Sequence, residues 1–161
     1  MNILHTKFIQ NLIASPLTRK LLSGWQPKVD AFLLKVSRGW LSIAIGQPII
    51  RMETIGAKSG IKRVVALACM PRTESGEQQI ILVASNWGQA KHPAWYHNLK
   101  ANEDVAVCFR GYVGNMKAKE LEGEEKAKIW EEAKLFNSGY VVYEERITQR
   151  SIPVIMLRRE P

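Results

Sequence analysis

A short loop with two glycines and three cationic side chains is the segment of this sequence with the clearest chemical character. It runs Gly56-Ala57-Lys58-Ser59-Gly60-Ile61-Lys62-Arg63. Glycines let backbone N–H groups approach a ligand, while Lys and Arg supply charge and Ser supplies a hydroxyl. The loop therefore predicts a cradle for a phosphate or carboxylate group. The alternative is a solvated basic turn, and the P-loop pattern is absent.

A second candidate site lies between Ile80 and Asn102. Five apolar residues, Ile80–Ala84, predict a buried strand, and the turn-forming cluster Ser85-Asn86-Trp87-Gly88 ends it. A short helix then begins at Pro93-Ala94-Trp95-Tyr96, where a proline is tolerated in the first turn. A strand, a polar loop and an aromatic helix in succession frame a flat ligand. An ordinary strand–loop–helix junction with a buried Trp is the alternative.

Three side chains could take part in chemistry directly. Ser85 could donate a hydrogen bond to a ring carbonyl or nitrogen, but no Gly-x-Ser-x-Gly elbow surrounds it, which argues against a hydrolase. Tyr140 and Tyr143 lie three residues apart on a predicted helix and could line a pocket or donate a hydrogen bond to a substrate. Core packing is their alternative role.

Cysteine and histidine usage argues against a metal site. Cys69 and Cys108 form no CxxC pair, and both lie in apolar runs. The three histidines, His5, His92 and His97, lack the spacing of metal ligands with any carboxylate. We therefore expect neither a metal centre nor a disulfide framework.

Charge is distributed unevenly along the 161 residues. The net charge is +8, and residues 1–63 carry all of it, with ten basic and two acidic residues, whereas residues 64–161 have thirteen of each. A local positive field favours an anionic partner such as phosphate, an acidic cofactor tail, anionic lipid or nucleic acid. Nucleic acid is disfavoured because no known binding motif is present.

The first 48 residues predict helices and the remainder predicts mainly strands. An early amphipathic segment contains Leu12 and Leu17, and a second helix is expected over Val29–Ile45. Neither has the roughly 20 apolar residues of a membrane span. They either pack on the domain or lie on an anionic membrane surface. We divide the chain into a basic helical extension, 1–45, and a barrel domain, 46–161.

About six strands in successive hairpins predict an α+β fold with a closed or partly open, mostly antiparallel barrel and flanking helices. The expected strands are Ile49–Ile55, Arg63–Met70, Gln79–Ala84, Val105–Arg110, Val113–Leu121 and Ile152–Leu157. Pro71–Glu77 is expected to be an exposed link. A helix over Gly123–Phe136 should turn Ala127, Trp130, Ala133 and Leu135 inward, and a second should cover Tyr140–Thr148.

Several of these segments together resemble the deazaflavin-dependent nitroreductase family over roughly residues 46–157. The matching segments are Gly56–Gly60, Arg63, Val83–Asn86, His92–Leu99 and Ile152–Val154, of which the HPxWYxNL element is the most specific. The resemblance implies a split β-barrel that binds coenzyme F420, a deazaflavin with a phosphate and an oligoglutamate tail. It implies hydride transfer to a quinone, a nitroaromatic compound or a similar acceptor.

The resemblance also implies roles for individual residues. The phosphate and tail would be held by Ala57, Lys58, Ser59, Arg63, Val64, Val65, Ala66, Leu67 and Ala68. The deazaflavin ring would be framed by Val83, Ala84, Ser85, Asn86, Ala94, Trp95, Tyr96, His97 and Asn98. Tyr140 would meet cofactor and substrate, and Tyr143 would line the acceptor pocket.

Four alternatives stay open at this point. FMN could replace F420. The barrel could bind a flavin, lipid or other flat ligand without turnover. Residues 1–45 could make a peripheral membrane contact with an otherwise cytoplasmic protein, and two chains could pair as a homodimer.

Overall fold

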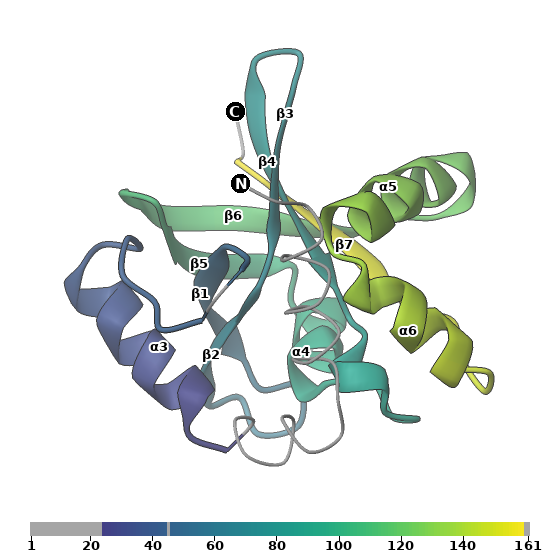
Figure 1. Ribbon diagram of the computed structural model, residues 1–161. Coiled ribbons are helices and arrows are strands. Elements are labelled where there is room, and N and C mark those ends of the chain that lie inside the picture. The colour runs from purple at the N-terminus through teal and green to yellow at the C-terminus, as the bar shows by residue number, and fades with distance from the viewer. Residues whose placement is uncertain (1–23, 45, 160–161) are drawn as a thin grey trace.

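One antiparallel sheet of seven strands organises the part of the chain that this computed structural model describes, residues 24–44 and 46–159 (Figure 1). Its order is β2-β1-β5-β6-β7-β4-β3. The strands are β1 Ile49–Ile55, β2 Lys62–Ala68, β3 Met70–Glu74, β4 Glu77–Val83, β5 Asp104–Phe109, β6 Tyr112–Glu120 and β7 Val154–Arg158. The helices are α3 Gln26–Val36, α4 Ala94–Ala101, α5 Gly123–Phe136 and α6 Gly139–Arg146, with a 3-10 turn, η1, over Asn86–Gly88.

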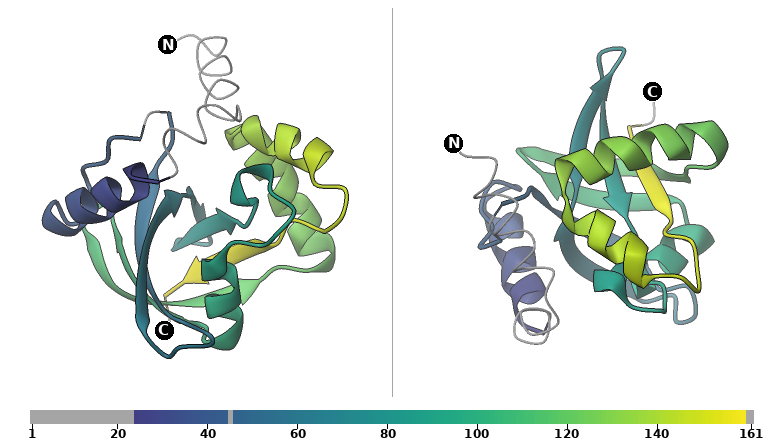
Figure 2. Two further views of the ribbon diagram at one scale, coloured as in Figure 1. Left: turned by 90° about the horizontal axis from the view of Figure 1, so that it is seen from below. Right: turned by 45° about the vertical axis from the view of Figure 1, so that its right-hand side comes forward.

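The sheet curls so that its two ends approach each other. Strand β6 joins the halves, because it pairs with β5 over residues 112–117 and with β7 over residues 117–120. Strands β2 and β4 lie far apart in the strand order, yet Leu67 and Val83 line the same pocket. The observed fold is the expected antiparallel split barrel with flanking helices, with α3 on one side and α5–α6 on the other (Figure 2).

Alternating side chains build two cores from the same strands. On β4, Leu82 belongs to the barrel interior, whereas Ile81 belongs to the cluster beneath α5 and α6. On β7, Leu157 points inward and Met156 outward in the same way. Because successive strand residues face opposite sides, a continuous apolar run is what a strand covered on both faces requires. The α5–α6 pair is therefore fixed directly behind the end of β4.

Helix α3 packs on β1 and β2 through a small cluster of Leu34, Ile49 and Ala66. It ends earlier than the expected Ile45, because Gly39 adopts φ +88° and donates its N–H to the Leu34 carbonyl at 2.7 Å. A Cβ at Gly39 would lie 2.5 Å from the Phe109 backbone, so only glycine fits this approach. The amphipathic segment expected around Leu12 and Leu17 lies outside the described residues, and the division at residue 45 stays a prediction.

The segment expected as an exposed link after Pro71 is instead a strand. Residues Met70–Glu74 form β3, which pairs with β4 around Ser75 and Gly76, both at positive φ. Such a two-residue turn suits the twist of a hairpin. Strand β3 lies at the sheet edge, where the missing N–H of Pro71 leaves no bond unmade. The sheet therefore has seven strands, not six.

Helix α5 has the expected bounds but a different inward face. Ile129 and Ala133 are buried, whereas Ala127 is exposed and Leu135 is 88% exposed, so two of the four inward assignments were wrong. Trp130 is partly buried against the core, as expected. Among the described residues, no helix has the length and apolar character needed to cross a bilayer.

Candidate functional site

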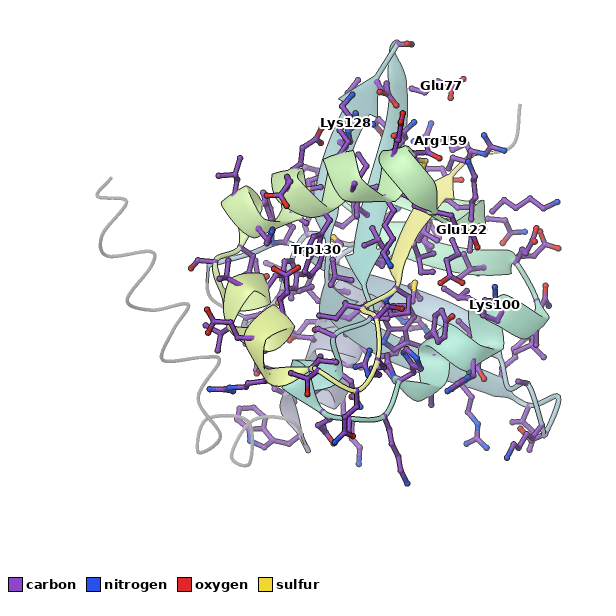
Figure 3. All side chains as sticks on the ribbon, turned by 90° about the vertical axis from the view of Figure 1, so that its right-hand side faces the viewer. Glu77, Lys100, Glu122, Lys128, Trp130 and Arg159 are labelled. Carbon is purple, nitrogen blue, oxygen red and sulfur yellow. The ribbon has the colours of Figure 1, made fainter. Side chains whose placement is uncertain are left out.

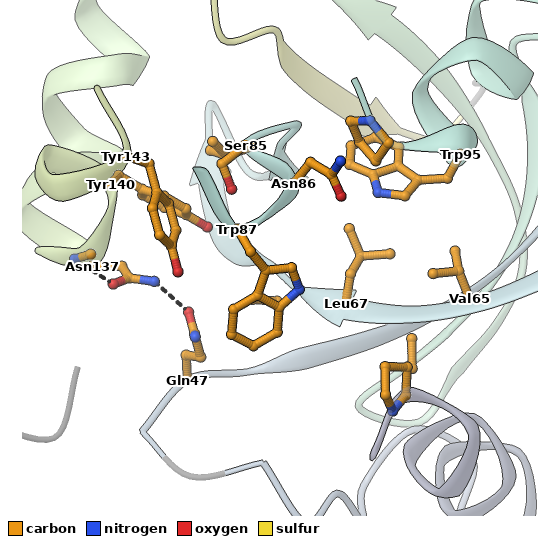
Figure 4. Close-up of a pocket in the computed structure, with 16 residues that line it drawn as sticks. Gln47, Val65, Leu67, Ser85, Asn86, Trp87, Trp95, Asn137, Tyr140 and Tyr143 are labelled. Carbon is orange, nitrogen blue, oxygen red and sulfur yellow. Dashed lines mark hydrogen bonds between the residues drawn. The ribbon is translucent and has the colours of Figure 1, made fainter. Parts of the chain in front are cut away.

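A pocket of about 250 Å³ opens between β2, the loop after β4, α4 and α6 (Figure 4). It collects half of the residues that the sequence analysis assigned to a site. Val65–Ala68, which the resemblance assigned to the phosphate and tail, instead line this cavity together with residues assigned to the ring. The predicted residues that line it are Val65, Ala66, Leu67, Ala68, Val83, Ser85, Asn86, Trp95, Tyr140 and Tyr143. Four separate segments therefore converge on one cavity, as a planar ligand with polar edges requires.

The loop between Ser85 and Gln89 has an unusual backbone. Asn86, Trp87 and Gly88 all adopt left-handed conformations, with φ values of 50°, 57° and 75°. This conformation turns the Trp87 indole into the cavity, where Figure 4 shows it between Tyr143 and Leu67. A left-handed Trp is strained, because its Cβ approaches the following carbonyl group. The side chain of Trp87 narrows the pocket at its centre.

Arg150 holds this loop from behind. Its guanidinium donates to the carbonyl oxygens of Ala84 at 3.3 Å, Ser85 at 3.0 Å and Gln89 at 3.0 Å. It also donates to His92 Nδ1 at 3.1 Å, which requires a neutral imidazole. Burial lowers the pKa of His92, and the positive charge of Arg150 acts in the same direction. The Ser85 side chain is thus presented by a clamped backbone.

Tyr140 and Tyr143 form the opposite wall. Both side chains are buried, with ring centroids 6.4 Å apart. Burial strongly raises the pKa of Tyr140, with a smaller opposing effect from its hydrogen bond with Asn137. The Tyr140 phenol therefore stays neutral at physiological pH and can donate a hydrogen bond. A Cβ at Gly88 would lie 3.1 Å from the Tyr143 ring, so the loop packs directly on α6.

The basic loop lies at the end of the same strand that lines the pocket. Asn98 of α4 attaches it, because its Oδ1 accepts the Ala57 N–H at 3.0 Å and its Nδ2 donates to Thr54 at 3.0 Å. Arg63 pairs with Thr54 in the β1–β2 register. Since alternate strand residues share a face, Arg63 lies on the same face of β2 as Val65 and Leu67, but it is exposed and does not itself line the pocket.

Several predicted residues lie outside the pocket lining. Lys58, Ser59 and Val64 are exposed on the β1–β2 hairpin. Ala84 is buried behind the cavity, Ala94 and His97 are exposed on α4, and the Tyr96 hydroxyl donates to the Glu120 carboxylate at 3.1 Å. Ala57 and Asn98 form the hydrogen bond that attaches the basic loop to α4. These residues surround the site without forming its wall.

Residues that the sequence analysis did not assign to a ligand also line the pocket. They are Pro27, Gln47, Trp87, Pro93, Asn137 and Gly139. Asn137 donates to Gln47 Oε1 at 2.7 Å across 90 positions of sequence, and its Oδ1 accepts the Gly139 N–H at 2.9 Å. The Asn137-Ser138-Gly139 helix break was the one available signal for this corner, since Asn and Gly favour such turns.

The sequence model of the F420H(2)-dependent quinone reductase family matches residues 30–159. This chain belongs to that family. An F420H(2)-dependent quinone reductase of Mycobacterium tuberculosis is 34% identical over 115 residues, which cover 70% of this chain and 74% of that protein. As a member of this family, the chain is an oxidoreductase and its cofactor is coenzyme F420. The matches give no support to FMN as the cofactor.

Solved structures agree with the family and the fold. A structure described as an F420-H2 dependent reductase, FDR-A, superposes with a TM-score of 0.59 and 41% identity over 69% of this chain and 94% of its own. A second, described as a domain-swapped dimer, gives a TM-score of 0.60 and 38% identity over 72% of this chain and 84% of its own. Split-barrel F420-dependent reductases are therefore the structural relatives of this chain.

The residues present fit coenzyme F420. Its flat ring matches a cavity walled by Trp95, Leu67 and the two tyrosines, and its acidic tail matches the basic hairpin loop at the start of β2. Gly56 shapes that loop, because a Cβ there would lie 2.6 Å from Ser59 Oγ. Apolar walls for a ring and cations for a tail are the donor set that such a molecule needs.

Proposed function

We propose that this chain transfers hydride from reduced F420 to a quinone bound in the same pocket. The observation that carries the proposal is the path of β2, which begins beside the basic loop and ends in the wall of the cavity. From Arg63 to Leu67 the strand advances about 13 Å, at roughly 3.3 Å per residue. One molecule with an anionic tail and a flat head can follow this strand face.

Charge selects the orientation of the cofactor in this proposal. Lys58, Lys62 and Arg63 are exposed near the α4 end of β2, where they can meet phosphate and carboxylate groups. Further along β2, Val65 and Leu67 offer apolar surface for the ring, together with Trp95 of α4. The deazaflavin supplies the hydride, while the protein binds, orients and shields it from water.

The polar groups of the pocket would act on the acceptor. Ser85 lies at the end of β4 with its backbone carbonyl held by Arg150, so its hydroxyl is well positioned to bond a ring edge. Tyr140 keeps its proton because burial raises its pKa, and it can donate to an acceptor carbonyl oxygen. Tyr143, beside it, completes the wall on that side. No covalent nucleophile is required.

A quinone fits this site better than a nitroaromatic compound does, because an apolar chamber adjoins the pocket. This second cavity, about 260 Å³, lies under α3 and shares Gln47, Leu67 and Trp87 with the first. Ile43, Ala44 and Ile49 give it an apolar lining that suits an alkyl substituent. Nitroaromatic acceptors, which lack such a chain, are the second candidate substrates.

The test is turnover of reduced F420 with a short-chain naphthoquinone, followed by the return of the oxidised deazaflavin absorbance. We expect Lys58→Gln/Arg63→Gln to weaken F420 affinity at least about tenfold, with a reduced salt dependence. Lys126→Gln/Lys128→Gln removes equal charge from α5 and should leave the affinity unchanged. Equal affinity in both double variants would place the tail elsewhere. Binding without turnover of quinones or nitroaromatics would favour a non-catalytic flavin-binding role.

A peripheral membrane contact is a second proposal, which the outer face of α3 favours. Val29, Phe32 and Val36 are 37%, 64% and 60% exposed and follow helical spacing, while Leu34 is buried on the opposite face. Lys28 and Lys35 lie along one side of this apolar stripe. Apolar residues bordered by lysines suit the surface of an anionic bilayer.

Vesicle sedimentation distinguishes that contact from an inert exposed stripe. We expect the full chain to sediment with phosphatidylglycerol vesicles and Phe32→Glu to sediment less. Leu135→Glu, on the exposed face of α5, is the matched control. Equal sedimentation of both variants would argue against a role for α3. A homodimer also stays a proposal, and the domain-swapped relative is its support.

A further inference from the structure

A large cavity lies at the other end of the barrel from the cofactor pocket. It has a volume of about 570 Å³ and opens between the β3–β4 hairpin and the β5–β6 turn, and it shares no lining residue with the cofactor pocket. Figure 3 shows Arg159 beside the β3–β4 hairpin and Lys100 on α4 toward the other end of the molecule. The volume of this cavity is within the range of small-molecule sites.

The lining of this cavity is cationic and has no acidic residue. Three of its residues are arginines: Arg72, Arg110 and Arg159. Arg72 is neutralised, since it pairs with Glu74 at 2.7 Å and with Glu132 at 3.1 Å. Arg110 and Arg159 form no ion pair with any residue that the structure describes. Among the described residues, these two guanidinium groups therefore face one cavity without a carboxylate partner, and Arg159 also donates to Gln78 Oε1 at 3.3 Å.

Aromatic rings hold both guanidinium groups in place. Arg110 Cζ lies 5.2 Å from the Phe109 ring centroid, and Arg159 Cζ lies 4.1 Å from that of Tyr112. The Tyr112 ring is itself fixed, because its hydroxyl donates to the Asn115 carbonyl oxygen at 2.8 Å. A guanidinium stacked on a ring presents the N–H groups along its edge to planar anions, and Arg159 uses one of them in its exposed bond to Gln78.

The turn that carries Arg110 is anchored to the end of α3. Arg110 and Gly111 both have positive φ, and their N–H groups donate to the carbonyl oxygens of Gly39 at 3.0 Å and Arg38 at 2.7 Å. The backbone donors of the turn are therefore already used. An incoming anion would therefore be bound by side chains and not by the backbone of this turn, and Arg110 would reach it from a fixed position.

We propose that this cavity is a second ligand site, in which Arg110 and Arg159 bind a phosphate or carboxylate group. Ile80 and Met116 provide an apolar floor beside the two arginines, and Thr73 and Gln78 add polar groups at the rim. This combination fits an anionic group attached to an apolar or aromatic body. The site is separate from the proposed hydride transfer. Its anion could come from a free phosphorylated compound or from a lipid headgroup.

The experiment maps binding of phenyl phosphate on the full chain by amide chemical shifts. We expect saturable shifts at residues 110–112, and at least about a tenfold loss of affinity in Arg110→Gln/Arg159→Gln. Arg110→Lys/Arg159→Lys keeps the charge but loses the fork and the stacking, so it should lose affinity too. Lys58→Gln/Arg63→Gln is the control for binding at the cofactor end and should keep these shifts.

A second part of the experiment uses vesicles to identify the source of the anion. Phenyl phosphate shifts without a change in sedimentation would indicate a free ligand. Reduced sedimentation of Arg110→Gln/Arg159→Gln with phosphatidylglycerol, but not with phosphatidylcholine, would indicate a headgroup. The proposal is overturned if neither probe responds to these arginines, or if all shifts lie in residues 57–63. The wild type and Arg110→Gln/Arg159→Gln should bind F420 with equal affinity. This comparison shows that the loss of phenyl phosphate binding does not arise from damage to the cofactor site.

Discussion

Tyr140 illustrates how burial selects the chemistry of a single side chain. Its ring lies 6.0 Å from Trp130 and 6.4 Å from Tyr143 between centroids, and burial raises the pKa of its phenol. The neutral phenol is thus favoured in the folded state. Stability from this group is complete below about pH 10, the ordinary tyrosine pKa, and declines as the unfolded chain ionises above it.

We predict that Tyr140→Phe keeps the fold but lowers kcat/KM for quinones about 10- to 100-fold, because a hydrogen bond to the acceptor is lost. The variant should also lose part of the decline in melting temperature seen above about pH 10. Quinone kinetics and thermal melts at several pH values measure both effects. An unchanged kcat/KM would restrict Tyr140 to core packing, and Tyr143→Phe provides the comparison on the neighbouring ring.

Trp87 occupies the centre of the pocket in a conformation that glycine adopts more easily. Its φ of 57° is left-handed, which costs a side-chain-bearing residue about 1–2 kcal/mol. We predict that Trp87→Gly changes the free energy of unfolding by no more than about 1 kcal/mol, because relief of strain offsets lost packing. The cavity it leaves should raise kcat/KM for bulky quinones relative to small ones about tenfold.

Asn86→Gly is the matched control for that prediction. Asn86 has the same left-handed backbone, with φ 50°, but a smaller side chain in the pocket. If strain relief alone governed the kinetics, both variants would change the acceptor preference alike. A preference that changes only in Trp87→Gly would identify the indole as the residue that sets acceptor size.

At the scale of elements, the sequence predicted the features that depend on residues close together in the chain. The bounds of β1 and α5 follow from apolar spacing, and the Gly56–Gly60 hairpin follows from its glycines. Strand β3 was missed because Pro71 argues against a strand unless the strand lies at an edge, and the edge is a tertiary fact. The end of α3 was missed because contact between Gly39 and Phe109 decides it.

The loop from β4 to α4 depends on Arg150, which follows α6. We predict that Arg150→Gln lowers the free energy of unfolding by about 1–3 kcal/mol, since charge-assisted bonds to three carbonyl groups are lost. It should also lower kcat by loosening Ser85. Urea unfolding and quinone turnover measure the two effects. Arg158→Gln, on the exposed end of β7, is the control.

The same clamp predicts a dependence on pH. Burial, Arg150 and His97 lower the pKa of His92, and Glu120 opposes them. Because the pKa of His92 is lowered in the folded state, the neutral imidazole contributes stability above about pH 6.5, the ordinary histidine value. That contribution is lost as pH falls through the folded-state pKa. Melting temperatures should therefore fall on acidification in the wild type and fall less in His92→Gln. Equal slopes would contradict the clamp.

At the scale of the molecule, the pocket exists because the two ends of the sheet approach each other. Sequence motifs indicated Ser85, Trp95 and Tyr140, since each lies in a recognisable local segment. They could not indicate Gln47 and Asn137, which meet at 2.7 Å across 90 residues. Such a contact depends on the curl of the sheet, which brings the start of β1 beside α6.

The Gln47–Asn137 hydrogen bond should hold the two sides of the pocket together. We predict that Asn137→Leu lowers the free energy of unfolding by about 1–3 kcal/mol, because Gln47 and the Gly139 N–H lose a buried partner. Amide exchange should accelerate in residues 46–50 and 137–140. Asn115→Leu, at an exposed position of β6, controls for the loss of an amide.

In a double-mutant cycle of Asn137→Leu with Gln47→Leu, we expect a coupling energy of about 0.5–1.5 kcal/mol. Additive effects of the two variants would show that this contact does not join the sides of the barrel.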